Sequence, residues 1–114
     1  MATKKELKEL YKQMKPDMGV FFLVDETLKK GQVFAVADLK SRINRVRFQL
    51  EMGSSPWREI QREWNSSGAD RWDFRVLEHL DYDEDETKTD YAEDLELLKM
   101  EWEEKLARQG YTFF

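Results

Sequence analysis

The apolar residues of this chain recur in two rhythms, one typical of strands and the other of helices. Runs of strand-forming side chains occupy Gly19–Val24 and Gln32–Val36, and the polar stretch between them ends in glycine. Two short runs joined in this way predict an antiparallel hairpin. A third run, Trp72–Leu77, alternates apolar and polar side chains, which predicts a strand with one buried face.

Four other stretches repeat apolar residues every three or four positions, the spacing of one helical face. Capping residues fit their ends: Asp38 has the side chain of an N-cap before the second helix, and Gly53 and Gly110 follow the second and fourth helices. Pro56 is expected in the first turn of the third helix. The predicted helices cover residues 3–15, 39–52, 56–64 and 90–109.

This order of elements predicts a small α+β domain in which helices flank a three-stranded mixed sheet. A length of 114 residues matches one domain. The first helix precedes the sheet as an amphipathic addition, with Leu7, Leu10, Tyr11 and Met14 on one face. We therefore divide the chain into an N-terminal helical extension, residues 1–17, and a domain, residues 18–114.

Composition removes several classes of function. The chain has no cysteine and a single histidine, His79, so thiol chemistry and a multi-histidine zinc site are excluded. No glycine-rich phosphate loop and no nucleophile elbow occurs. No apolar run is long enough to span a bilayer, and no secretory signal opens the chain. We expect a cytoplasmic protein without a membrane partner.

Charge adds two features to this picture. The formal net charge is −5, and residues 81–90 form a loop with six acids and one lysine. This loop lacks the central glycine and the closing glutamate of a calcium loop, so a solvated loop is expected. The second predicted helix and its successor carry arginines and lysines that either contact phosphates or form an ordinary solvated face; the charge pattern alone favours the solvated face.

Five stretches together resemble the GIY-YIG nuclease domain in their order and spacing. The second of them begins eleven residues after Phe21. The resemblance covers residues 18–107 and implies the fold of that family. The stretches are Gly19–Phe21, Gln32–Phe34, Asp38–Arg45, Glu63–Glu78 and Leu97–Trp102.

The resemblance also implies a degenerate active site. The family hydrolyses DNA phosphodiesters with two tyrosines, an arginine, often a histidine, and a glutamate that holds one divalent metal ion. Arg42 stands at the position of the arginine. Phe21 and Gln32 stand at the positions of the tyrosines, and neither can act as a base. Val46 replaces the histidine, and Lys99, a cation, replaces the metal-binding glutamate.

These replacements predict a pseudoenzyme without a cofactor. The resemblance alone favours a nucleic-acid-associated binding or regulatory module that binds DNA or RNA weakly. A protein-interaction module that uses the N-terminal helix or the acidic loop is an alternative. A second alternative is an endonuclease dependent on Mg²⁺ or Mn²⁺, with its site rebuilt around Glu96 or the acidic loop. The candidate nucleic-acid-binding residues are Lys40, Arg42, Arg45, Arg47 and Arg58.

Overall fold

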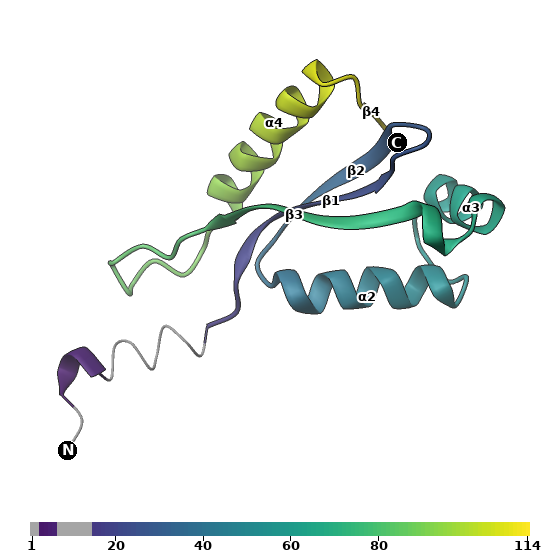
Figure 1. The fold of residues 1–114 in the computed structure, drawn as a ribbon. Coiled ribbons are helices and arrows are strands. Elements are labelled where there is room, and N and C mark those ends of the chain that lie inside the picture. The colour runs from purple at the N-terminus through teal and green to yellow at the C-terminus, as the bar shows by residue number, and fades with distance from the viewer. Residues whose placement is uncertain (1–2, 7–14) are drawn as a thin grey trace.

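The computed structural model describes residues 3–6 and 15–114. The apolar face predicted for the N-terminal helix, residues 7–14, lies outside the described residues. The start of the predicted helix lies among the described residues. There Thr3 Oγ1 accepts a hydrogen bond from the backbone N–H of Glu6 at 3.2 Å, as expected of a helix cap. Residues 3–6 are exposed and stand away from the sheet and its helices (Figure 1).

A four-stranded sheet in the order β3-β1-β2-β4 forms the centre of the fold. Strands β1 (Met18–Asp25) and β2 (Lys30–Val36) form the predicted antiparallel hairpin, with Phe21 opposite Phe34. Strand β3 (Trp72–Leu80) pairs antiparallel with the other edge of β1. It ends three residues beyond the predicted Leu77, because its pairing with β1 continues to the partners Leu80 and Met18.

The prediction of three strands misses β4 (Thr112–Phe113), which pairs parallel with the start of β2. Its backbone is fixed by hydrogen bonds from Thr112 N–H to Lys29 O at 2.9 Å and from Phe114 N–H to Gly31 O at 3.1 Å. Two residues are too few for a detectable alternation, and the pairing joins segments that are far apart in the sequence. The sheet is mixed, as predicted.

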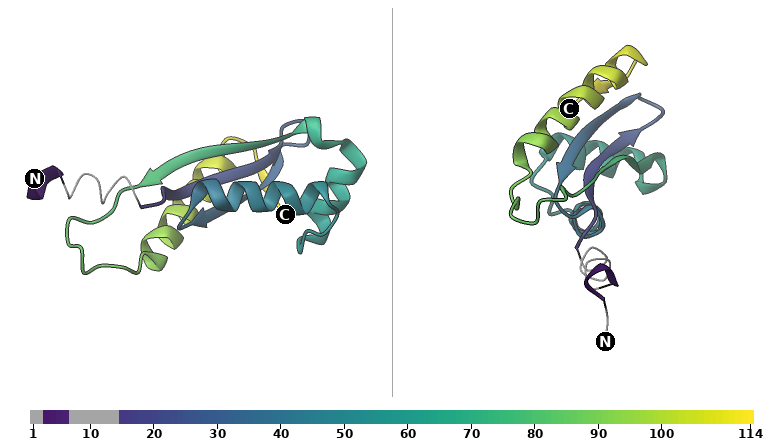
Figure 2. Two further views of the ribbon diagram at one scale, coloured as in Figure 1. Left: turned by 90° about the horizontal axis from the view of Figure 1, so that it is seen from below. Right: turned by 90° about the vertical axis from the view of Figure 1, so that its left-hand side faces the viewer.

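Helices cover both faces of the sheet (Figures 1 and 2). On one face lie α2 (Leu39–Glu51) and α3 (Arg58–Ser67), packed on a core that includes Phe21, Leu23 and Trp64. On the other face lies α4 (Ala92–Arg108), packed on Val20, Phe22 and Val24. All eight residues of β1 are buried, since successive side chains enter opposite cores.

Local signals place both ends of α2 within one residue, but the prediction for the next helix is wrong at both ends, because α3 runs from Arg58 to Ser67 and not over residues 56–64. Asp38 Oδ1 caps α2 by accepting the N–H of Ser41 at 3.1 Å. Pro56, however, precedes α3, whose N-cap is Trp57. The predicted start is wrong because Ser55 Oγ accepts the N–H of Trp57 at 3.2 Å and the N–H of Ser55 donates to the side chain of Gln61, also at 3.2 Å. These bonds hold residues 55–57 in a turn.

Across residues 3–6 and 15–114, the structure contains no helix with the length and apolar character that a membrane crossing requires.

Candidate functional site

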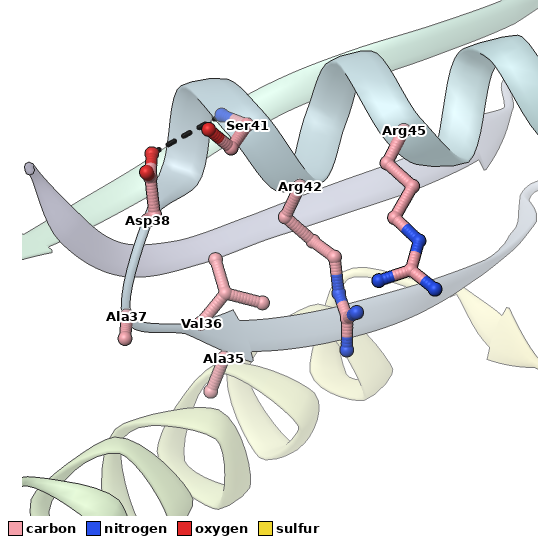
Figure 3. A pocket seen from close by; sticks show the side chains of 7 residues that line it. All are labelled: Ala35, Val36, Ala37, Asp38, Ser41, Arg42 and Arg45. Atoms are coloured by element: carbon pink, nitrogen blue, oxygen red, sulfur yellow. Dashed lines mark hydrogen bonds between the residues drawn. The ribbon is translucent and has the colours of Figure 1, made fainter.

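A pocket of about 360 Å³ lies where β2 passes into α2 (Figure 3). The end of the strand and the turn after it form one wall, and one face of the helix forms the other. Two arginines contribute the positive charge of the pocket. The lining residues are Ala35, Val36, Ala37, Asp38, Ser41, Arg42 and Arg45.

Helical geometry explains why these side chains converge. Ser41 and Arg42 lie three and four residues after Asp38, and Arg45 lies four and three residues after them, so these side chains share the face of α2 that looks across β2. The start of the helix is fixed by its cap and by a hydrogen bond from Leu39 N–H to the carbonyl of residue 17 at 2.8 Å. The position of both arginines therefore follows from the anchored first turn.

The arginines of the pocket have unsatisfied hydrogen-bonding capacity. Arg42 Nε is buried and has no hydrogen-bond partner among the described residues. Within the same described part of the chain, neither Arg42 nor Arg45 forms an ion pair. Figure 3 shows both guanidinium groups extending from α2 toward β2. Because no described carboxylate pairs with either guanidinium group, an anion that enters the pocket can accept hydrogen bonds from both.

Asp38 is the carboxylate that lines the pocket, and its role there is structural. Its Oδ1 atom accepts the N–H of Ser41 at the start of α2. A carboxylate in this position stabilises the helix N-terminus and leaves the two guanidinium groups without a close counter-charge. The pocket is therefore positive where the arginines extend.

The structure places Phe21 and Val46 away from this pocket, inside the core. Phe21 is 0% exposed and stacks on Phe34 with ring centroids 4.8 Å apart. Val46 is 1% exposed and belongs to the same apolar cluster. Neither side chain is among those that line the pocket beside Arg42.

Gln32 and Lys99 lie in two further places. Gln32 and Arg58 line a separate hollow of about 240 Å³ with Trp57 and Phe114. Lys99 is half-buried on α4, the helix that covers the opposite face of the sheet. Of the five residues of the degenerate nuclease site, only Arg42 lines the pocket of Figure 3.

The other basic candidate residues lie outside the pocket of Arg42 and Arg45. Lys40 is exposed on α2 and does not line the pocket. The guanidinium of Arg47 lies over the Phe74 ring, 4.6 Å from its centroid, so its charge is directed toward β3. Arg42 and Arg45 are the two basic candidates that the structure brings together.

Carboxylate and histidine side chains are not clustered in the described part of the chain. In residues 3–6 and 15–114, no three His, Asp or Glu side chains are grouped so that they could hold one. In the pocket, one oxygen of the single carboxylate is engaged by the cap of α2. We therefore derive no metal-dependent step from this site.

Side chains of the acidic loop, residues 81–90, form hydrogen bonds within the loop and with the start of α4. Thr87 donates from its hydroxyl and its backbone N–H to Asp85, which lowers the pKa of that carboxyl below its ordinary value. Lys88 forms an ion pair with Asp94 on α4 at 2.7 Å and lies over the Tyr91 ring. This hydrogen bond to Asp94 raises the pKa of Lys88. The loop is thus tied to the start of α4.

Ser41 and the residues Ala35–Ala37 line the pocket but were not among the site residues predicted from the sequence. A signal for Ser41 was present, because its position three residues after Asp38 and four before Arg45 puts it on the same helical face. The contribution of the strand end depends on how α2 packs against β2, which no local pattern encodes.

No protein-family model and no curated protein matches this sequence. Two solved structures are similar to it. The catalytic domain of the homing endonuclease I-TevI superposes with a TM-score of 0.63 and 20% identity, over 83% of this chain and 96% of that one. The catalytic domain of the intron endonuclease I-TevI in a mutant form gives a TM-score of 0.51 and 25% identity, over 60% and 70%. The element order, the mixed sheet and these two similarities show that the chain has the fold of the GIY-YIG nuclease domain.

Proposed function

We propose that this chain is a catalytically inactive GIY-YIG-like domain that binds nucleic acid through the pocket of Arg42 and Arg45. The observation that carries the proposal is the pair of guanidinium groups that line one pocket, neither of which forms an ion pair within the described residues. A phosphate oxygen is an acceptor of the right charge, and a guanidinium binds phosphate with two parallel hydrogen bonds.

The chemistry of the surrounding residues supports binding without hydrolysis. Phosphodiester cleavage needs a group that activates water and groups that neutralise the developing charge. Asp38 is engaged as a helix cap, and Phe21 is buried and has no hydroxyl group. Gln32 lies in another hollow and has no titratable group. Arg42 and Arg45 can hold a phosphate, and the one carboxylate among the residues that line the pocket is that of the helix-capping Asp38.

The structural similarity favours nucleic acid over other phosphate compounds. Both similar structures are catalytic domains of an endonuclease, as their names state. In this chain an arginine pocket lies at the junction of β2 and α2, which supports a site for a backbone phosphate. We infer that the bound anion is a phosphate of a DNA or RNA backbone.

Binding is expected to be weak and to depend strongly on salt. The whole chain carries a formal net charge of −5, so long-range attraction of a polyanion is poor. Two arginines neutralise about two phosphates, which gives a slope of roughly −2 in a plot of log affinity against log salt for duplex DNA.

Fluorescence anisotropy of labelled DNA and RNA, at low and at moderate salt, tests this proposal. The variant Arg42→Glu/Arg45→Glu is expected to lose saturable binding. The matched control is Arg58→Glu/Arg62→Glu, which changes the net charge equally on the exposed surface of α3. The control should retain more of the affinity than the pocket variant. Equal losses in both variants would contradict a specific pocket, as would the absence of binding at low salt.

A cleavage assay tests the second half of the proposal. Supercoiled, linear and branched DNA incubated with the protein and Mg²⁺ or Mn²⁺ should remain intact. Cleavage by the unmodified chain that disappears in an Arg42→Ala variant would show that the site is active and that the proposed loss of catalysis is wrong.

A further inference from the structure

The outer face of α4 carries an apolar stripe bordered by acids. Leu97 and Met100 are 60% and 56% exposed, and their spacing of three residues puts them side by side. The leucines on the opposite face of the helix are buried against the sheet. We call this surface the α4 stripe. It consists of Leu97, Met100 and the exposed glutamates Glu93, Glu96, Glu101 and Glu104.

The N-terminal segment of the same chain has the complementary composition. Residues 1–15 contain five lysines against two glutamates, whereas α4 contains six acids against three basic residues. Apolar residues at positions 7, 10, 11 and 14 of the segment recur at helical spacing. A basic amphipathic segment and an acidic apolar helix face suit each other in both charge and hydrophobicity.

The described residues show where this segment leaves the domain. The ammonium of Lys15 lies over the Tyr82 ring, 4.9 Å from its centroid, and the Tyr82 hydroxyl donates to the carbonyl of Pro16 at 2.6 Å. Beyond this anchor, residues 3–6 are exposed and stand away from α4 of their own chain (Figure 1). The α4 stripe of the same copy is therefore not covered by residues 3–6.

We propose that the N-terminal segment of one copy, residues 3–14, docks on the α4 stripe of a second copy, and that the two copies exchange these segments reciprocally. Such an arrangement is symmetric, since each copy offers the same segment and the same stripe. The two apolar residues of the stripe form a small contact, and the surrounding charges are screened by salt. The dimer is accordingly weak, and it forms at high protein concentration and low ionic strength. This inference is independent of the proposed function.

Sedimentation equilibrium of the full chain measures the association. The average mass should rise from 13.8 kDa toward twice that value as the concentration increases. The variant Leu97→Glu/Met100→Glu should remain at the mass of one chain. The control Leu28→Glu/Val76→Glu changes two other exposed apolar residues, which are 48% and 45% exposed, and should associate like the unmodified chain. Circular dichroism verifies that each variant is folded.

A charge exchange distinguishes this interface from any other. One variant carries Lys4→Glu, Lys8→Glu and Lys12→Glu in the segment, and the second carries Glu96→Lys, Glu101→Lys and Glu104→Lys in the stripe. Each variant alone should fail to associate, because its segment and stripe then have the same sign of charge. An equimolar mixture should associate again, because both exchanged contacts are attractive. A single-chain mass for the unmodified protein at all concentrations would overturn the proposal. So would association that survives in both separate variants, or a mixture that does not associate.

Discussion

Arg42 is the residue at which stability and function are expected to conflict. A buried N–H group without an acceptor destabilises the free protein, and structures retain such groups where a ligand supplies the acceptor. The Arg42 side chain is half-buried, so its replacement must preserve volume.

The variant Arg42→Met should therefore stabilise the free protein while it weakens nucleic-acid binding. Removal of the unsatisfied donor should raise the free energy of unfolding by roughly 1 kcal/mol, measured by urea denaturation. Arg45→Met is the matched control: Arg45 is exposed, so its stability should change by less than about 0.5 kcal/mol. A clear loss of stability in Arg42→Met would mean that Arg42 has a structural partner.

The burial of Phe21 leads to a prediction about the position at which the resemblance expects a catalytic tyrosine. The Phe21 ring is fully buried and stacked on Phe34, so a hydroxyl added there enters an apolar cluster. Phe21→Tyr should lower the free energy of unfolding by about 1–3 kcal/mol. The variant should also fail to cleave DNA. Unchanged stability would indicate that the hydroxyl reaches a polar surface, contrary to this account.

The hydrogen bonds of Glu26 lead to a prediction of how the free energy of unfolding changes in acid. The Tyr111 hydroxyl donates to Glu26 at 2.5 Å, and Arg75 pairs with both Glu26 and Asp73. The bond from Tyr111, followed by the contacts of Arg75, lowers the pKa of Glu26 below its ordinary value of 4.5. Because the folded pKa is the lower one, the stabilisation is complete above pH 4.5 and is lost as the pH falls through the folded pKa.

The urea midpoint, measured from pH 7 down to about pH 3, tests this sign. Glu26→Gln should be less stable than the unmodified chain near neutral pH, and the difference should shrink in acid. Glu84→Gln, a change in the exposed acidic loop, is the control and should show a much smaller difference at neutral pH. A difference between Glu26→Gln and the unmodified chain that grows in acid would contradict the prediction.

At the scale of elements, Gly19 sets the approach of β3 to β1. A Cβ atom built at Gly19 would lie 2.1 Å from the carbonyl oxygen of Glu78 and 3.0 Å from the Cα atom of His79. The neighbouring register shift, between Val20 and Phe21, lies in the same pairing. The glycine therefore permits contact between two backbones that a side chain would separate.

Gly19→Ala should destabilise the sheet by about 1–3 kcal/mol, because the backbone of β3 must move. Gly53→Ala is the comparison: its Cβ would meet open space, so only the positive φ of 73° opposes it, at about 1 kcal/mol. Thermal unfolding of both variants measures the difference. A smaller effect at Gly19 than at Gly53 would contradict the close approach described here.

The elements that could be predicted are those whose signals are local. The hairpin follows from two apolar runs and a short turn, and α2 follows from its cap at Asp38. Strand β4 could not be predicted because its two residues pair with the distant Lys30 and Gly31. The residues of the candidate site also divide into those that the sequence selects and those whose placement depends on tertiary packing. The resemblance selects Arg42, but the turn of Arg47 toward Phe74 depends on tertiary packing that spacing does not encode.

At the scale of the whole molecule, the sheet separates two surfaces of opposite charge. Helix α2 carries four basic residues and one acid, and α4, on the other face, carries six acids and three basic residues. A polyanion is attracted to the first surface and repelled by the second. Nucleic acid is therefore expected to approach from the side of α2, where Arg42 and Arg45 extend (Figure 3).

The most direct test of this claim is an NMR titration of the ¹⁵N-labelled chain with a short DNA duplex at low salt, in which backbone and arginine side-chain signals are followed. Saturable changes are expected for residues 35–45 and for the Nε–H of Arg42, and the signals of α4 should be unchanged apart from effects of protein concentration. Changes centred on α4 or on the acidic loop, or no change for Arg42, would contradict it.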